Sequence, residues 1–448
     1  MTKNDATPEP TPRKPAGWLL LALRRLCDRL RGRSLSQEWP VGELPFRAEI
    51  FCAEQMEQHG SLLAKRHMLG QSGRLDQLLL RLDNNEYRLN EARTLLIEAV
   101  KSKLQIAPAG EWLLDNFYLI DDQIRTARRH LPKDYSRELP RLAQGPSAGF
   151  PRVYDLALEV ISHGDGRVDG EDLRLFISAY QRVTPLLLGE LWAIPIMLRL
   201  AMIENLRRVS ARVAASRLHV NQAQFWANEM LAAVENDPKA LILVVADMAR
   251  SNPPMESAFV AELARCLQGH GPELALPLTW IKQRLAETSF TIEQLVLSEN
   301  QQQAADQVSV SNTIGSMRFL SAMDWREFVE SISLVEQVLR RDASGIYSAM
   351  DFSTRDCYRR VVDRLAKSTP GFAENLAHTE IAVAQAAVDL AQRSSVEHEE
   401  AASECHNHVV HVGYYLIDEG RPALEVELGV QLSFYERARR RMSRAPLL

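Results

Sequence analysis

The segment from Glu111 to Leu142 carries a dense set of acidic and basic side chains. Aspartates can act as a general acid and a general base, and neighbouring arginines can hold a phosphate group. The residues in question are three aspartates and three arginines: Asp115, Asp121, Asp122, Arg125, Arg128 and Arg129. Their types alone would allow a catalytic surface.

The same segment also has a structural interpretation, which the order of its charges favours. Acids occupy the first half of the predicted helix and arginines its last turns, as the helix macrodipole prefers. Asp121 and Asp122 can each pair with Arg125, four and three residues further on. On a single helix, Asp115 and Asp122 would share one face. We expect four apolar side chains to be available for burial: Trp112, Phe117, Ile120 and Ile124.

A second candidate is the histidine-rich stretch HEEAASECHNHVVHVGYY, which begins at His398. On a helix, Glu404, His408 and His411 share a face at steps of four and three residues, a spacing that could bind zinc. The HExxH motif is absent, however, and histidines on a helix are more often surface or core residues. The sequence therefore predicts no metal site, although these three residues would be the ligands of one.

Other strings that could carry chemistry are incomplete. HGDGRVDGEDLRLF resembles a calcium-binding loop, but Arg167 and Phe176 would stand at its third and twelfth positions. We predict instead that one helix ends near Gly164 or Gly166 and that Asp169 caps the next. GxxxxGK, GxGxxG, GxSxG and DxD-type strings are all missing. The sequence therefore assigns no catalytic residue.

The composition excludes several classes of protein. Of 448 residues, 46% are apolar and 25% are charged, which is typical of a globular chain. A formal net charge of −5 argues against a nucleic-acid partner. Five scattered cysteines without a CxxC pair indicate a reducing compartment. GWLLLAL is too short to span a bilayer, and Glu190 and Arg199 interrupt PLLLGELWAIPIMLRLAMI, so we expect a soluble chain.

Helical periodicity runs through nearly the whole chain from residue 45 onward. We predict a break near Asp83–Asn85, a helix capped by Asp324 with one apolar stripe over Trp325–Leu339, and a helix capped by Ser353. The one β-like run, ALILVV, also fits a buried helix. The sequence therefore predicts an all-α fold, a multi-helix array of right- and left-packed helices with short loops after a disordered, proline-rich amino terminus.

Turn and composition signals divide this array. The boundaries rest on the proline- and glycine-marked turn at Gly145–Pro151 and on a polar stretch at Ser298–Gln307, where we expect a break. The predicted parts are a disordered lead-in at 1–15, a basic amphipathic helix and linker at 16–44, helical groups at 45–150, 151–300 and 301–430, and a basic juxtamembrane tail at 431–448. The amphipathic helix could dock on the body or attach to an anionic membrane.

Several long strings resemble the amino-terminal, pre-transmembrane region of bacterial cyclic β-1,2-glucan synthases. They include EWLLDNFYLIDDQIR, AYQRVTPLLLGELWAIPIMLRLAMIENLRR, VSVSNTIGSMRFLSAMDWREFVESISLVEQVLRRD and HVGYYLIDEGRPALE. The resemblance covers about residues 111–208, 308–365 and 411–425, in the family's order. It marks a signature helix carried by five residues: Trp112, Asp115, Tyr118, Asp122 and Arg125.

The resemblance implies a role but no active site. The family consists of large inner-membrane proteins of Gram-negative bacteria, with a membrane-embedded glycosyltransferase that uses UDP-glucose and phosphorylase-like domains. This chain departs from that pattern because it ends at Leu448, so no catalytic acid is carried over to it. UDP-glucose and a divalent metal are expected only for the full-length synthase. The implied role is a support or interaction domain on the cytoplasmic face of the inner membrane, partnered by the rest of the synthase and the membrane surface.

Two alternatives stay open at this point. In the first, tyrosines contact or carry glucan, because aromatic rings stack on sugars: Tyr118, Tyr135, Tyr154, Tyr414 and Tyr415. In the second, the chain is an unrelated helical ligand-binding protein. A concave groove lined by exposed aromatic residues would favour glucan contact, whereas a flat apolar patch near the carboxyl end would favour a support domain.

Overall fold

The computed structural model describes residues 43–70, 77–131, 138–286, 289–370, 376–398 and 409–430. The chain divides into two units, Met1–Leu44 and Pro45–Leu448, and the following concerns the second. The predicted lead-in at 1–15, nearly all of the predicted amphipathic helix and linker at 16–44, and the basic tail at 431–448 lie outside the described residues.

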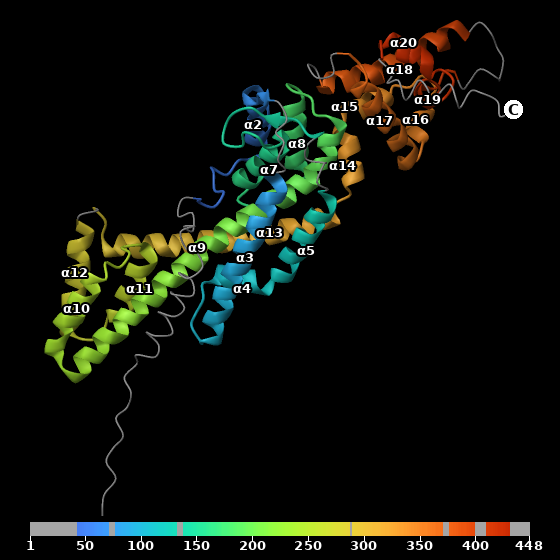
Figure 1. The fold of residues 1–448 in the computed structure, drawn as a ribbon. Coiled ribbons are helices and arrows are strands. Elements are labelled where there is room, and N and C mark those ends of the chain that lie inside the picture. The colour runs from blue at the N-terminus through green and yellow to red at the C-terminus, as the bar shows by residue number, and fades with distance from the viewer. Residues whose placement is uncertain are drawn as a thin grey trace, which may run out of the picture. The chain divides into compact units, whose positions relative to one another are not determined.

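The described part of the chain is all-α, as predicted (Figure 1). The first elements are α2 (Ala53–Arg66), β1 (Leu69–Gly70), α3 (Gln77–Lys101), α4 (Pro108–Asp115), α5 (Phe117–His130), β2 (Arg141–Leu142), α7 (Arg152–His163), α8 (Gly170–Gln181) and α9 (Leu188–Asn236). Next come η1 (Pro238–Ala240), α10 (Leu241–Arg250), α11 (Ser257–Leu267), η2 (Pro272–Leu274), α12 (Ala275–Ala286) and α13 (Ile292–Ala322). The last are α14 (Trp325–Ile332), α15 (Leu334–Leu339), α16 (Ile346–Ala349), α17 (Phe352–Lys367), α18 (Leu376–His398), α19 (Val412–Ile417) and α20 (Arg421–Glu427). The two short strands pair antiparallel.

The longest helix, α9, takes part in three hydrophobic cores. Leu188 belongs to the carboxyl-terminal core with α15–α20, Leu191–Val213 to the central core with α2–α8, and Ala223–Met230 to the α10–α12 core. Between Leu191 and Val213 its buried residues lie on all sides of the helix, which explains the long apolar run as a core helix. None of the described helices is long and apolar enough to cross a membrane.

Two predicted breaks do not occur, and α3 and α13 both continue through them. α3 is continuous through Asp83–Asn85, where Asn85 is buried. α13 is continuous through the predicted break at Ser298–Gln307 and packs along α9 (Figure 1). Its two buried acids, Glu299 and Asp306, accept hydrogen bonds from hydroxyl and guanidinium groups of neighbouring segments. A polar stretch that faces such partners does not need to leave the helix.

Capping residues confirm some predicted helix starts and correct others. Asp169 and Asp324 cap α8 and α14 as predicted, each accepting two backbone N–H groups. The predicted stripe from Trp325 to Leu339 is split between α14 and α15, because the hydroxyl of Ser333 caps a new helix. The prediction that Ser353 caps α17 is wrong; Asp351 caps it by accepting from the amides of residues 353 and 354.

Gly60 sets how closely α2 and α8 can approach. A Cβ at this position would lie 2.6 Å from the carbonyl oxygen of Phe176, which is backbone and cannot rotate away. We therefore expect Gly60→Ala to lower the free energy of unfolding by about 1–3 kcal/mol, measured by urea denaturation. The matched control is Gly315→Ala in α13, where a Cβ meets nothing within 4 Å, so stability should stay equal or rise. Equal effects of the two variants would contradict this packing argument.

Candidate functional site

The signature segment Glu111–Arg125 forms two helices instead of one. Asn116 ends α4 and begins α5; its amide donates to the Trp112 carbonyl (3.0 Å) and its side-chain oxygen accepts from Arg318 (2.7 Å). The prediction that Asp115 and Asp122 share a face of a single helix is therefore wrong. All five signature residues are exposed: Trp112, Asp115, Tyr118, Asp122 and Arg125.

Charges in this segment pair within the protein. Asp122 lies 3.5 Å from Arg125, whereas Asp121 lies 3.9 Å from Arg93 of α3 instead of pairing with Arg125. Arg128 donates to two carboxylates of α3, at 2.7 and 2.6 Å. These contacts tie α5 to α3 and leave Arg128 engaged by acids, so they support the structural interpretation of the segment. Of the side chains expected to be available for burial, Phe117, Ile120 and Ile124 are buried, but Trp112 is 39% exposed.

The predicted tyrosine contacts fall in different environments. Tyr135 lies outside the described residues. Tyr154 is 2% exposed in the central core, so its ring faces are covered and cannot stack on a sugar. Tyr415 is 5% exposed, and its hydroxyl lies 2.6 Å from that of Ser394. Tyr414 is half-buried and faces a surface hollow, whereas Tyr118 is 66% exposed on α5, so these two are the described candidates for sugar contact and Tyr414 is the one beside a hollow.

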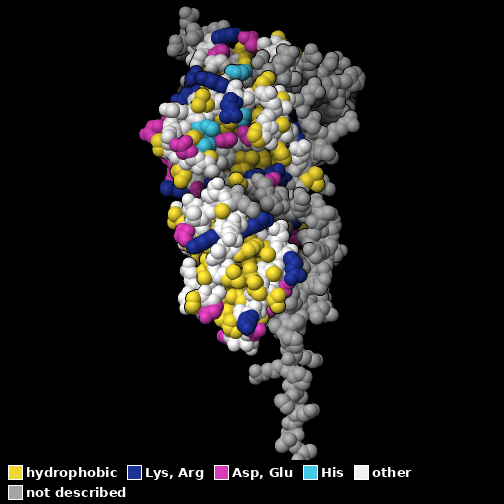
Figure 2. Space-filling view, turned by 90° about the vertical axis from the view of Figure 1, so that its left-hand side faces the viewer, with side chains coloured by type: hydrophobic (Ala, Val, Ile, Leu, Met, Phe, Trp, Pro, Cys, Tyr) yellow, Lys and Arg dark blue, Asp and Glu magenta, His cyan; other side chains and the backbone are white. Residues whose placement is uncertain are grey.

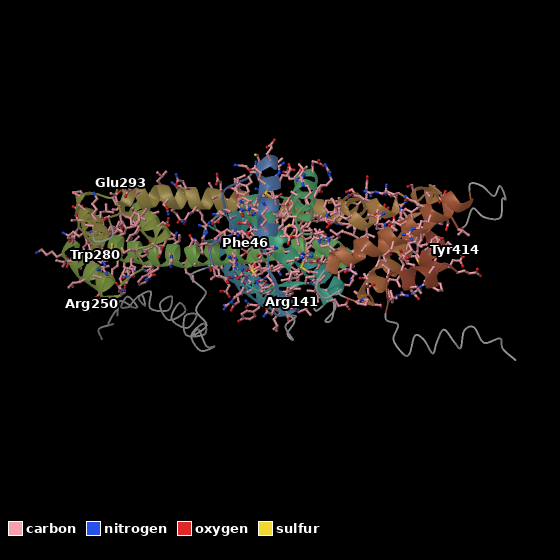
Figure 3. All side chains as sticks on the ribbon, turned by 90° about the horizontal axis from the view of Figure 1, so that it is seen from above. Phe46, Arg141, Arg250, Trp280, Glu293 and Tyr414 are labelled. Atoms are coloured by element: carbon pink, nitrogen blue, oxygen red, sulfur yellow. The ribbon has the colours of Figure 1, made fainter. Side chains whose placement is uncertain are left out.

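The hollow beside Tyr414 is the candidate binding site of the carboxyl-terminal core. It has a volume of about 550 Å³. Its lining combines two aromatic rings, two aliphatic side chains and two titratable groups: Tyr358, Tyr414, Ile346, Ile417, His411 and Asp418, with the backbone of Gly413. Tyr414 and Trp280 of α12 lie at opposite ends of the Pro45–Leu448 unit (Figure 3). A hollow with aromatic faces and polar edges can accept a sugar or another flat polar ligand.

His411, a predicted metal candidate, has a structural partner in this hollow. Its Nδ1 lies 2.9 Å from a carboxylate oxygen of Asp342, whose other oxygen accepts from the amide of Val412 (2.8 Å). Burial opposes the charge of Asp342, but hydrogen bonds from His411, Ser344 and Val412 outweigh it and hold its pKa below the ordinary value. The other two metal candidates, Glu404 and His408, lie outside the described residues.

A second hollow, of about 440 Å³, lies between α9, α14 and α17. Trp192 and Phe352 meet edge to face there, with ring centroids 6.1 Å apart. Some of its cations have acidic partners; for example, Arg360 lies 2.7 Å from a carboxylate oxygen of Asp356. Arg326 instead lies over the ring of Phe352, 5.0 Å from its centroid.

Glu380 of α18 is a buried acid near this hollow. One carboxylate oxygen accepts from the Leu188 amide (2.9 Å), and the other is buried without a hydrogen-bond partner in the described structure. Burial raises the pKa of Glu380 to about 8, although the Leu188 amide works in the opposite direction. Because the folded pKa exceeds the ordinary 4.5, stability falls as pH rises from about 4.5 to about 8.

We therefore expect Glu380→Gln to stabilise the protein by about 2–4 kcal/mol at pH 8 and to change little at pH 4. Glutamine keeps an oxygen that can accept from the Leu188 amide and removes the buried charge. The measurement is urea denaturation across this pH range, with the exposed Glu419→Gln as control. A benefit that does not grow with pH would show that Glu380 is ionised in the folded state.

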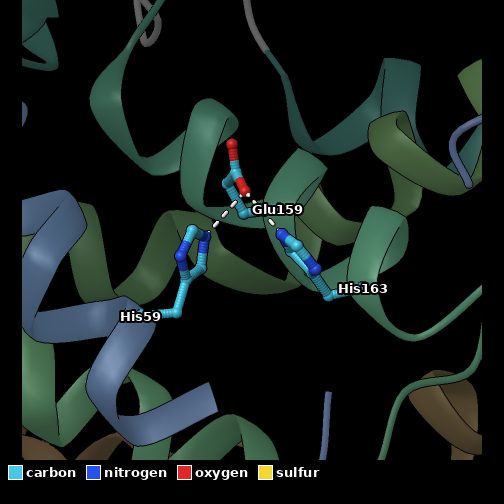
Figure 4. A group of neighbouring side chains, drawn as sticks. All are labelled: His59, Glu159 and His163. Atoms are coloured by element: carbon cyan, nitrogen blue, oxygen red, sulfur yellow. Dashed lines mark hydrogen bonds and ion pairs between the residues drawn. The ribbon is translucent and has the colours of Figure 1, made fainter. Parts of the chain in front are cut away.

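His59, Glu159 and His163 form a cluster that was not predicted from the sequence. Both imidazole Nε2 atoms approach the same Glu159 oxygen, at 2.8 Å from His59 and 3.3 Å from His163 (Figure 4). Glu159 and His163 stand one turn apart on α7, a spacing visible in the sequence. His59 comes from α2, a hundred residues earlier, and nothing in the sequence pattern connects it with the other two.

Comparison with known proteins identifies a relative of this chain. No protein-family model matches it. A curated relative, cyclic beta-(1,2)-glucan synthase NdvB of Rhizobium meliloti (strain 1021), is 27% identical over 393 residues, which are 87% of this chain. The chain is similar to cyclic β-(1,2)-glucan synthase. It spans 13% of the length of that synthase, an amino-terminal portion. The similarity therefore confirms the resemblance suggested by the sequence strings and extends it to most of the chain.

Proposed function

We propose that this chain is a support and interaction domain of a cyclic β-1,2-glucan synthase. The observation that carries the proposal is the similarity to the synthase over 87% of the chain. Charges on α5 support it, because Asp121 and Arg128 pair with side chains of α3. In this proposal the domain lies on the cytoplasmic face of the inner membrane, and the remainder of the synthase binds UDP-glucose and a divalent metal.

An exposed apolar patch gives the proposed domain a surface for contact. Ile242 and Leu243 of α10 are 61% and 64% exposed, and Leu276 of α12 is 44% exposed. Apolar side chains gather in the lower half of the face shown in Figure 2, on the side where α10 and α12 lie in Figure 1. The patch lies in the middle of the sequence, not near the carboxyl end, where a flat apolar patch would have favoured a support domain. Exposed apolar patches commonly mark protein–protein contacts.

The proposal predicts that this chain and the remainder of the synthase purify together in detergent. Ile242→Ser with Leu243→Ser should weaken the association, because it removes apolar area from the α10–α12 patch. The matched control is Leu80→Ser with Val100→Ser on α3. Leu80 is 61% exposed and Val100 is 50% exposed. Association that is absent for the wild-type chain would contradict the proposed support role. Equal association of all variants would contradict the role of the α10–α12 patch but not the support role itself.

A second candidate function is contact with glucan at the hollow beside Tyr414. The specific observation is that the half-buried ring of Tyr414 lines it together with His411 and Asp418, whereas Tyr358, which also lines it, is 5% exposed. We expect linear β-1,2-glucan oligosaccharides to shift tyrosine side-chain NMR signals of the wild-type chain. Tyr414→Ala should abolish the shifts, whereas Tyr118→Ala on the exposed face of α5 should leave them intact. Shifts that survive Tyr414→Ala would exclude this hollow as the contact.

A further inference from the structure

The cluster of His59, Glu159 and His163 has the composition of a transition-metal site. Two imidazole nitrogens and one carboxylate oxygen lie within 4.8 Å of one another, on two different helices. We propose that these three side chains bind one divalent ion of the zinc class. The proposal does not depend on the role of the chain in glucan synthesis.

The hydrogen bond on the far side of His163 carries the argument. Its Nδ1 lies 2.7 Å from the backbone carbonyl oxygen of Glu49, and a carbonyl can only accept, so Nδ1 holds the proton. In the neutral ring, Nε2 then presents a lone pair to the Glu159 carboxylate oxygen 3.3 Å away. The lone pair and the carboxylate oxygen repel each other when nothing lies between them, whereas a cation between them can be coordinated by both. A ligating histidine commonly donates its other N–H to a backbone carbonyl in this way.

The distances fit a metal with small adjustments. In a tetrahedral site with bonds of about 2.0–2.1 Å, neighbouring ligand atoms lie about 3.3 Å apart. The separation between His163 Nε2 and the Glu159 oxygen is 3.3 Å, and that between His59 Nε2 and the same oxygen is 2.8 Å. Moving the His59 side chain away from the Glu159 oxygen by about half an ångström would bring this separation to the same value, and all three ligand atoms already lie within 4.8 Å of one another.

The surroundings hold His163 in place and leave one side open. The ring of Phe51 stacks on that of His163, with centroids 3.8 Å apart, and the Phe51 amide donates to the His163 carbonyl (3.2 Å). The side chains of His59, Glu159 and His163 are 16%, 30% and 11% exposed. Three protein ligands at a partly exposed position leave a fourth place for water or an external group.

The ligand set also selects the class of metal. Imidazole nitrogens suit zinc, copper, nickel and cobalt, whereas calcium and magnesium prefer sites made of oxygens. Because α2 supplies one ligand and α7 the other two, a bound ion would fasten these helices together. Binding to the folded chain alone should then raise its melting temperature.

The test is zinc binding to the whole chain after removal of metal, measured by calorimetry and by metal content after dialysis. We expect His59→Ala with His163→Gln to remove one bound zinc ion per chain and the zinc-dependent rise in melting temperature. His408→Ala controls for the histidine-rich stretch and should retain both effects at this site. Circular dichroism establishes that each variant is folded.

A second measurement does not depend on the variants. Cobalt(II) bound by two imidazoles and a carboxylate in tetrahedral geometry should give visible absorption bands, and zinc should abolish them. The proposal is overturned if the double variant binds as much zinc as the wild-type chain. It is also overturned if cobalt gives no tetrahedral bands, because Glu159 and the two histidines then form a metal-free ion pair.

Discussion

Glu204→Gln is expected to lower the free energy of unfolding by about 3–5 kcal/mol, because it leaves three arginines around a buried position without their counter-charge. Glu204 is fully buried on α9. Its carboxylate accepts from Arg81 at 2.7 and 3.1 Å, from Arg207 at 2.7 Å and from Arg208 at 3.0 Å. A neutral amide can accept one or two of these bonds but cannot balance the charge.

The same carboxylate should make stability depend on acid. Burial alone would raise its pKa, but the hydrogen bond from Arg81 and the charges of Arg207 and Arg208 outweigh burial and lower the pKa to about 2. The ordinary value is 4.5, so the contribution is fully present above about pH 4.5 and is lost as pH falls toward 2. The difference between the two pKa values corresponds to about 3 kcal/mol.

Urea denaturation of wild type and Glu204→Gln between pH 2.5 and 7 checks both statements. The two curves should converge as the pH falls. Glu171→Gln provides the control, since Glu171 pairs with Arg174 on the exposed surface of α8, where an ion pair contributes under about 1 kcal/mol. If the free energies of unfolding of wild type and Glu204→Gln differ by the same amount at every pH, the loss of stability in acid does not come from Glu204.

The second large effect is expected at the buried pair of Arg152 and Glu190. The two side chains are 2% and 0% exposed, and two guanidinium nitrogens lie 2.6 and 2.5 Å from the carboxylate oxygens. Arg152 also donates to the Pro185 carbonyl (2.9 Å), and Glu190 accepts from the Leu187 amide (2.9 Å) at the start of α9. Removing one partner, as in Glu190→Gln, should lower the free energy of unfolding by about 3–5 kcal/mol.

A double-mutant cycle measures the interaction free energy between Arg152 and Glu190 apart from the other contacts of each residue. Arg152→Met and Glu190→Leu should each be strongly destabilising, and the double variant should be more stable than the sum of the two losses predicts. Urea denaturation at pH 7 provides all four free energies. Simple additivity of the two losses would show that the charges act separately, against the contact seen in the structure.

Local signals were sufficient for part of the fold. Asp169 and Asp324 could be identified as caps because a cap acts on amides two and three residues away. The predicted break at Asp83–Asn85 was wrong. Asp83 and Asn84 are exposed on a continuous α3, where a helix tolerates polar residues, and Asn85 is buried in the same helix. The division into two helices at Asn116 was not predicted, because the contact with Arg318 that helps fix it comes from the distant helix α13.

The sites depend on distant contacts, and the sequence therefore revealed less about them. Tyr154 has a side chain suited to sugar contact, but only the packing of the central core shows that it is buried. The spacing of Glu159 and His163 was visible, whereas the approach of His59 follows from the packing of α2. The resemblance to glucan synthases could be recognised without knowing any tertiary contact, because it rested on long strings of residues.

Glucan synthesis from UDP-glucose, by membranes that carry the synthase with or without this region, tests the proposed support role most directly. We predict that synthesis fails without the region and returns when the folded chain is added. A variant with Asp115→Asn and Asp122→Asn should restore synthesis equally well, because these exposed acids are assigned no catalytic duty. Undiminished synthesis without the region would contradict the support role, and loss of synthesis in this folded variant would show that its acids take part directly.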